Sequence, residues 1–114
     1  KKRAATGFQT KISKNGGIYY IRKLFTLASA AGLSIYPGNH PTTSIGTAAI
    51  LHLCAAWPEP IKPGNVATGI NSSLADDIVV KSVRVENAAA YIPDGPGFGI
   101  ELDDDKVEKY TIEL

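Results

Sequence analysis

Lys11 ends a short strand-like run and is followed by a turn signal, Asn15-Gly16-Gly17. A lysine amine acts as a general base near neutral pH only where burial or a neighbouring cation lowers its pKa. The residues alone leave two interpretations open, a solvated surface charge and a base directed into a site, and they favour the surface charge. Lys14, inside the turn, is expected to be a solvated loop charge, and the two glycines belong to no phosphate-binding motif.

A second group of polar side chains lies in the loop Pro37-Gly38-Asn39-His40-Pro41. Asn39 and His40 either serve the turn or contact a substrate. His52 lies on an apolar helix and is expected to be a core histidine with its hydrogen bonds satisfied. The three successive acids from Asp103 are expected to cap a helix and interact with its dipole rather than to bind a metal. Cys54, the single cysteine, is expected to be a small buried hydrophobe.

Composition is that of an ordinary globular protein. The 114 residues suffice for one small domain, and 44% hydrophobic and 20% charged residues are usual for that class. No apolar run reaches the roughly 18–20 residues of a membrane span, and Lys1-Lys2-Arg3 is not followed by the apolar stretch of a signal peptide. The lone cysteine has no disulfide partner within the chain. The sequence therefore predicts a cytoplasmic protein with no membrane partner.

Charge is divided unevenly along the chain. Residues 1–58 hold seven Lys/Arg and no Asp or Glu, whereas residues 59–114 hold five Lys/Arg and all eleven acids. A basic half is one sign of nucleic-acid binding. Here the basic residues are scattered over a strand, a loop and a helix without interleaved aromatics, so we expect no nucleic-acid partner. The asymmetry instead favours a chain that begins within a larger protein, whose acidic side chains lie upstream.

Hydrophobic periodicity predicts an α/β order of elements. The expected elements are strands over 7–13 and 33–36, helices over 18–31 and 45–57, a connector over 58–74, short antiparallel strands over 77–80, 83–86 and 89–92, and a helix from Asp103 or Asp104 to Tyr110. Strand–helix–strand–helix order with short connections is typical of a parallel fold. Two such units do not make a stable parallel sheet, which needs both faces covered, and the second helix has more apolar surface than this chain can bury. The sequence therefore predicts part of a domain.

Spacing also predicts which side chains face the core and which end the helices. Apolar residues recur at helical spacing on the first helix: Ile21, Leu24, Phe25, Ala28 and Ala31. Gly32 stands just past the end of that helix, and Thr43 or Ser44 is expected to cap the next one. Trp57 is expected to be a packing aromatic, and Val107 and Tyr110 are expected to face inward on the last helix.

Five segments of the chain are distinctive in their order and spacing: TKISKNGG, the helix end AAG, SIYPGN, TSIGTAAILHLCAA and IPDGPGFGIELDDDKVEKY. Together they resemble the C-terminal third of the enolase superfamily, most closely the muconate-lactonizing enzyme (muconate cycloisomerase) subgroup. The resemblance extends from about Thr10 to Tyr110. It implies a (β/α)7β barrel with a capping domain, of which this chain supplies the last βα units and one capping segment. Residues 1–75 would belong to the barrel and residues 76–114 to the cap.

The resemblance also implies a chemistry. Enzymes of this superfamily remove the proton α to a substrate carboxylate, and Mg²⁺ stabilises the resulting enediolate. Lys11 stands where the subgroup carries the catalytic lysine of the sixth barrel strand. The resemblance therefore favours a catalytic base over a surface charge at this position. The metal ligands are carboxylates on the third, fourth and fifth strands, upstream of this chain. The 114 residues alone are then expected to be inactive, and the complete enzyme is expected to be a homo-oligomer acting on a small carboxylate.

One position departs from the family pattern. Cycloisomerases of the subgroup usually carry a glutamate in the loop after the seventh strand, where this chain has Thr42. A hydroxyl cannot replace a carboxylate as a charge partner, so racemization, epimerization or β-elimination stands beside cycloisomerization. The loop is similar to that of relatives acting on proline-type amino acids, such as cis-3-hydroxyproline dehydratase, and Asn39, His40 and Thr42 are the expected substrate contacts. The alternative function is a small stand-alone α/β binding or structural protein without catalysis.

Overall fold

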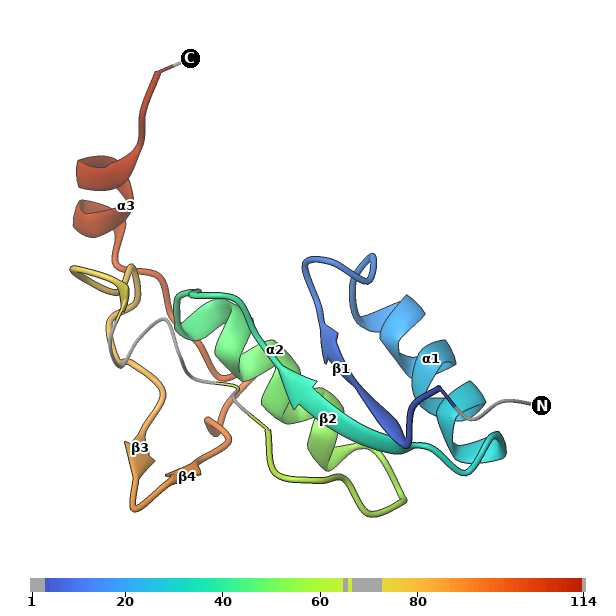
Figure 1. Ribbon diagram of the computed structural model, residues 1–114. Coiled ribbons are helices and arrows are strands. Elements are labelled where there is room, and N and C mark those ends of the chain that lie inside the picture. Colours follow the sequence, from blue (N-terminus) through green and yellow to red (C-terminus); the bar gives the residue numbers. More distant parts are fainter. Residues whose placement is uncertain (1–3, 65, 67–72, 114) are drawn as a thin grey trace.

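The computed structural model describes residues 4–64, 66 and 73–113, so Lys1–Arg3 and part of the predicted connector lie outside the described residues. Figure 1 shows a βαβα part beside a more extended C-terminal part. The helices and strands, in chain order, are β1 (Gly7–Lys11), α1 (Ile18–Ala30), β2 (Ser34–Gly38), α2 (Ser44–Ala55), β3 (Val85–Glu86), β4 (Ala89–Ala90) and α3 (Asp104–Tyr110). The predicted order of elements is confirmed except for the strand expected over 77–80, and the boundaries of the others differ by a few residues.

The first two strands pair in parallel, with Gly7 opposite Ser34 and Lys11 opposite Gly38. Helix α1 is the crossover between them, as a parallel connection requires. The strand expected to continue to Ser13 ends at Lys11, because the Lys11 carbonyl accepts hydrogen bonds from the backbone N–H groups of Lys14 and Asn15, at 3.1 and 2.9 Å. This turn follows directly on Lys11 and fixes where the strand stops.

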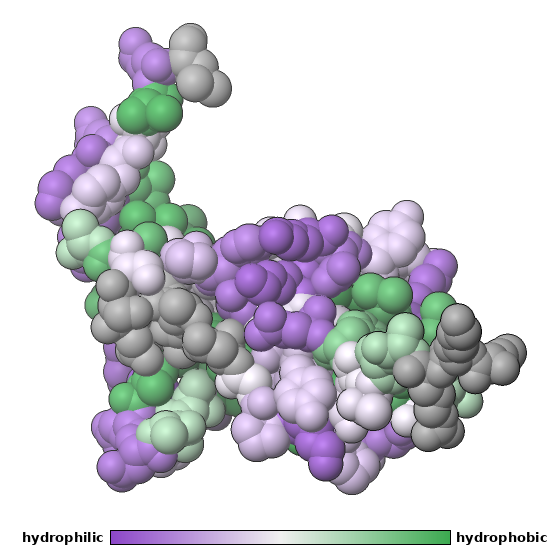
Figure 2. Space-filling model, in the orientation of Figure 1, coloured by the Kyte–Doolittle hydropathy of each residue, from purple (hydrophilic) through white to green (hydrophobic). Residues whose placement is uncertain are grey.

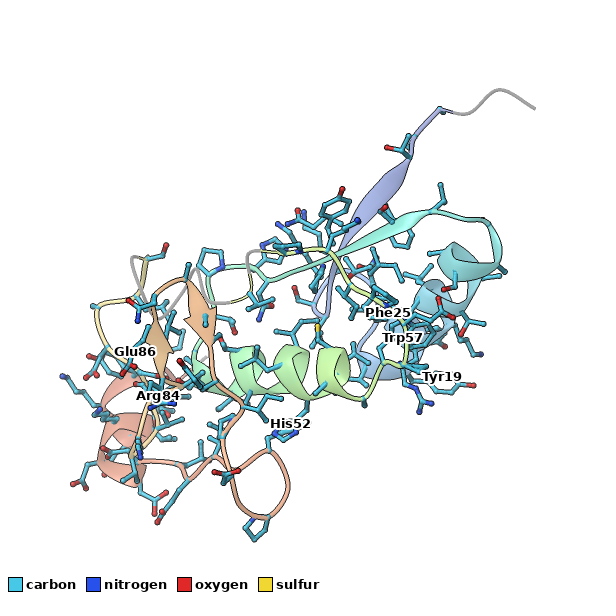
Figure 3. All side chains as sticks on the ribbon, turned by 90° about the horizontal axis from the view of Figure 1, so that it is seen from below. Tyr19, Phe25, His52, Trp57, Arg84 and Glu86 are labelled. Carbon is cyan, nitrogen blue, oxygen red and sulfur yellow. The ribbon has the colours of Figure 1, made fainter. Side chains whose placement is uncertain are left out.

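The core lies between the two long helices and the sheet. Six buried residues form it: Ile21, Phe25, Ala28, Ile35, Ile50 and Leu53. Three of them come from the predicted apolar face of α1. Trp57 packs edge-on against Phe25 with ring centroids 5.3 Å apart, and Figure 3 shows the two rings next to each other. The prediction that Trp57 is a packing aromatic is confirmed.

Helix α1 ends as its sequence predicts. Gly32 has φ of +66°, which a residue without a Cβ adopts at little cost. The Leu33 N–H then reaches back to the Ala28 carbonyl at 2.9 Å and satisfies one of the last acceptors of the helix.

The C-terminal part has less regular structure than predicted. The strand expected over 77–80 is reduced to a single bridge between Val79 and Leu102. The strands expected over 83–86 and 89–92 are the two-residue strands β3 and β4, which pair as an antiparallel hairpin. Asn87 and Ala88 turn this hairpin with φ of +51° and +62°. Such a turn needs positive φ at both central residues, and these are the two residues that the predicted strands leave between them.

Helix α3 begins as predicted, because the Asp103 carboxylate accepts from the Lys106 N–H at 3.1 Å. The prediction that Tyr110 faces inward on this helix is wrong, because its side chain is 45% exposed. Figure 2 shows hydrophobic residues at the surface along α3 and the segment leading into it, and Val80, Leu102 and Ile112 are among the exposed apolar side chains. No helix of the described residues is long and apolar enough to cross a membrane.

Candidate functional site

Lys11 lies at the carboxyl end of β1, directly opposite Gly38 at the end of β2. Its backbone N–H donates to the Asn15 Oδ1 at 2.8 Å, so the turn sequence Asn15-Gly16-Gly17 holds the residue in place. The side chain is half-buried, whereas Lys14 is exposed as predicted. The parallel register therefore brings Lys11 beside the loop that follows β2, which carries the other predicted site residues.

Asn39 is the first residue of that loop and is only 8% exposed. Its Nδ2 is buried and has no hydrogen-bond partner among the described residues. A buried amide without a partner costs free energy, so such a group generally has an explanation beyond packing. Among the described residues no acceptor meets this donor, and the side chain is covered rather than open to solvent.

His40 follows Asn39 and is half-buried. Desolvation, together with the positive charges of Lys11 and Lys14, lowers the pKa of His40 below its ordinary value of 6.5. The imidazole is therefore mainly neutral at neutral pH, when it donates one hydrogen bond and accepts another. Lys11 and His40 thus lie near each other at one end of the parallel pair, and Asn39 lies between the end of β2 and His40.

Thr42 lies further along the loop, over the first turn of α2. A Cβ built on Gly46 would approach the Thr42 Oγ1 to 2.5 Å, so the threonine covers this glycine closely. The side chain is half-buried. Thr42 therefore shares the loop with Asn39 and His40 but rests on the helix that follows it.

The predicted cap of α2 has the expected residue but a different hydrogen-bond acceptor. Thr43 occupies the N-cap position, yet its side chain makes no capping hydrogen bond. Asp77 supplies the acceptor instead: its Oδ1 accepts from the Ser44 N–H at 3.1 Å. Sequence reasoning missed this residue, because a cap is sought next to the helix and Asp77 stands 33 positions further along the chain.

His52 is not the core histidine that its apolar helix predicts. It is half-buried, and its Nε2 lies 3.2 Å from the Phe98 carbonyl oxygen. Its ring also stands against the Phe98 ring, with centroids 5.6 Å apart. Figure 3 shows His52 on the side of α2 that faces the C-terminal part. Its role is to join α2 to that part, away from Lys11.

Cys54 is partly buried on α2 and packs against the core. Burial raises the pKa of its thiol from 9.0 to about 11. Because the thiolate is the reactive form, at about pH 8 we expect alkylation by iodoacetamide to be about 100-fold slower than for an exposed thiol. The urea-unfolded chain is the control and should react at the ordinary rate; equal rates in both states would contradict the buried placement.

The residues around Lys11 offer a poor ligand set for a metal ion. Among the residues that the structure describes, no three His, Cys, Asp or Glu side chains gather as a metal site would require. The donors near Lys11 are an amide, an imidazole and hydroxyls, whereas Mg²⁺ is bound through carboxylates and phosphates. These residues do not fit a magnesium ion by themselves.

Comparison with known proteins supplies the family. Residues 1–106 match the model of the family described as "Enolase C-terminal domain-like". The chain is 34% identical to a chloromuconate cycloisomerase of Cupriavidus necator over 96% of its own length and 29% of the relative's. It is 38% identical to a chloromuconate cycloisomerase of Cupriavidus pinatubonensis, again over 96% of this chain and 29% of the relative. The chain thus spans less than a third of these relatives.

The solved structures agree. A muconate lactonizing enzyme from Klebsiella pneumoniae superposes with a TM-score of 0.84 at 34% identity, over 94% of this chain and 29% of that one. The two βα units, with no closed barrel in the described residues, are part of a TIM-type barrel fold. The chain belongs to the enolase C-terminal domain-like family and is related to the muconate-lactonizing enzymes of the enolase superfamily.

Proposed function

We propose that these residues are the C-terminal part of a magnesium-dependent enzyme that removes the proton α to a substrate carboxylate, with Lys11 as the base. The observation that supports this most directly is the position of Lys11 at the carboxyl end of a parallel strand, beside the loop after the next strand. Catalytic residues of TIM-type barrels stand at the carboxyl ends of the strands. Under this proposal the half-buried Lys11 amine acts as a general base instead of remaining a solvated surface charge.

The loop residues complete the chain's own contribution. The free Nδ2 of Asn39 would donate to a substrate oxygen, and neutral His40 would donate or accept one hydrogen bond at the opening of the site. The proton that leaves the α-carbon passes to the Lys11 Nζ. Thr42 would contact the part of the substrate furthest from Lys11, where a hydroxyl can assist a leaving group.

Magnesium would be held elsewhere in the complete enzyme. The described residues offer it no ligand set, and the resemblance assigns the carboxylate ligands to strands upstream of Lys11. Mg²⁺ supplies Lewis-acid stabilisation of a carboxylate substrate. The 114 residues alone would then bring a base without a metal site and would be inactive.

The reaction type is proposed from the loop. The relatives named above are cycloisomerases, and a cycloisomerase-type ancestry is the starting point. Thr42 in place of a loop glutamate favours epimerization, racemization or dehydration over lactonization. A hydroxylated proline-type amino acid is the substrate class that this loop suits best.

The same proposal covers organisation. Residues 1–75 would complete the barrel, and residues 76–114 would join the capping domain. The exposed apolar side chains along α3, among them Leu102 and Ile112, would be covered by the missing N-terminal part. The complete enzyme would act on a small carboxylate as a homo-oligomer in the cytoplasm, with no nucleic-acid partner.

Two measurements test the proposal. Denaturing mass spectrometry of the natural protein should find a polypeptide of roughly the length of the relatives, or a companion fragment, because a barrel of this type needs about 250 residues. The complete enzyme in D₂O should then exchange the α-proton of cis-3-hydroxy-L-proline, L-proline or muconolactone only with Mg²⁺ present. Exchange that persists in EDTA, or exchange by the isolated 114 residues, would contradict the proposal.

A further inference from the structure

Asp77 is a buried carboxylate outside the residues assigned to the site. It is 8% exposed and makes three hydrogen bonds through its two oxygens. Oδ1 accepts from the Ser44 N–H at 3.1 Å, and Oδ2 accepts from the Ser44 and Ser82 hydroxyl groups. A buried carboxylate with this many donors is held in one orientation.

These bonds fix the start of α2 from outside the helix. The Ser44 hydroxyl also accepts from the Val83 N–H at 2.8 Å, so Ser44 is bonded on both sides by the C-terminal part. Thr43, at the N-cap, supplies no side-chain bond of its own. The negative charge of Asp77 also stands at the positive end of the helix dipole. The beginning of α2 therefore depends on a residue that follows it by more than thirty positions.

The loop over residues 39–43 is consequently anchored at two points. At one end, the pairing of Gly38 with Lys11 holds it to the sheet. At the other end, Asp77 holds Ser44. Between these points lie Asn39, His40 and Thr42, the three residues expected to contact a substrate.

The anchor continues into the last helix. The Lys106 ammonium donates to the Asp77 carbonyl at 3.0 Å and pairs with Asp76 at 3.2 Å. Asp103 caps the same helix. Lys106 therefore ties α3 to the segment that carries Asp77.

We propose that Asp77 is a positioning residue that holds the substrate loop 39–43 against the end of the parallel pair, an inference that rests on the proposed function. Loss of the carboxylate releases the end of the loop at Ser44, whereas the turn that follows Lys11 keeps its hydrogen bonds. Substrate binding then weakens, while proton removal from substrate that is bound changes little. The effect falls on KM more than on kcat.

The test uses three variants of the complete enzyme. Asp77→Ala removes both carboxylate oxygens and keeps the backbone carbonyl that accepts from Lys106. Asp77→Asn keeps Oδ1 for the Ser44 N–H and places an amide donor near the Ser44 hydroxyl, so it is expected to restore part of the effect. Ile21→Val trims a buried residue of α1 that is remote from the loop, and it controls for a general loss of stability.

The first readout is amide hydrogen exchange over residues 44–47 and 82–83, which needs no substrate. Asp77→Ala should speed exchange there at least about 10-fold, and Ile21→Val should not. The second readout is α-proton exchange of cis-3-hydroxy-L-proline with Mg²⁺. Asp77→Ala should raise KM about 10-fold with kcat within about threefold, and Asp77→Asn should lie between it and the wild type.

Each contrary result overturns the inference. Unchanged amide exchange in Asp77→Ala would show that Asp77 does not anchor the start of α2. A loss confined to kcat, or a KM that rises equally in Ile21→Val, removes the positioning role. A wild-type enzyme that exchanges no α-proton of any of the three probes overturns the proposed function, and the inference with it, before any Asp77 variant is made.

Discussion

Replacing Lys11 by alanine is expected to reduce α-proton exchange by the complete enzyme by about 10²–10⁴-fold, the usual contribution of a positioned general base. The variant leaves the turn intact, because the bond to Asn15 comes from the Lys11 backbone N–H rather than from its side chain. Substrate binding should therefore persist while the proton-removing step is lost. The measurement is deuterium incorporation at the α-carbon of cis-3-hydroxy-L-proline in D₂O with saturating Mg²⁺.

Lys14→Ala is the matched control, since it removes the same charge three residues along in an exposed position. It should lower exchange by less than about threefold, as expected for a surface substitution outside the site. Retained exchange in Lys11→Ala would assign the base to another residue. A fall of equal size in both variants would show that the site needs positive charge in general rather than an amine at Lys11.

The βα part of the fold could be predicted from local signals. The spacing of apolar residues on α1, the glycine after its end and the turn after Lys11 each depend on neighbours within a few positions, and the structure contains all three. Parallel pairing followed from strand–helix–strand order, because only a crossover can return the chain in the same direction. The position of Lys11 beside the loop after β2 is a consequence of that pairing.

What the sequence could not give depends on contacts between distant segments. Asp77 caps α2 from 33 positions away. Thr43 is the residue that its place in the sequence favours as a cap, yet its side chain makes no such hydrogen bond. The apolar helix around His52 predicts a core position for it, yet its Nε2 meets the carbonyl oxygen of Phe98, 46 positions later in the chain. The periodicity of hydrophobic residues and the secondary-structure propensities of single residues carry no information about such distant partners.

The second large effect is on stability and concerns Phe25. This side chain is fully buried at the centre of the core and contacts the Trp57 ring edge-on. Phe25→Ala leaves a cavity between α1 and α2 that the surrounding helices only partly fill. We expect the free energy of unfolding to fall by about 3–5 kcal/mol, the range measured for buried phenylalanine. Urea unfolding of the complete enzyme, followed by tryptophan fluorescence and circular dichroism together, would measure the loss.

Leu27→Ala is the control on the same helix, because this leucine is 66% exposed. Its replacement should change the free energy of unfolding by no more than about 0.5 kcal/mol. A large loss in Leu27→Ala would mean that the exposed side of α1 is covered in the complete enzyme, by the rest of the barrel or by another subunit. A small loss in Phe25→Ala would mean that the α1–α2 contact contributes little to stability, and that contacts other than this core hold Lys11 in position.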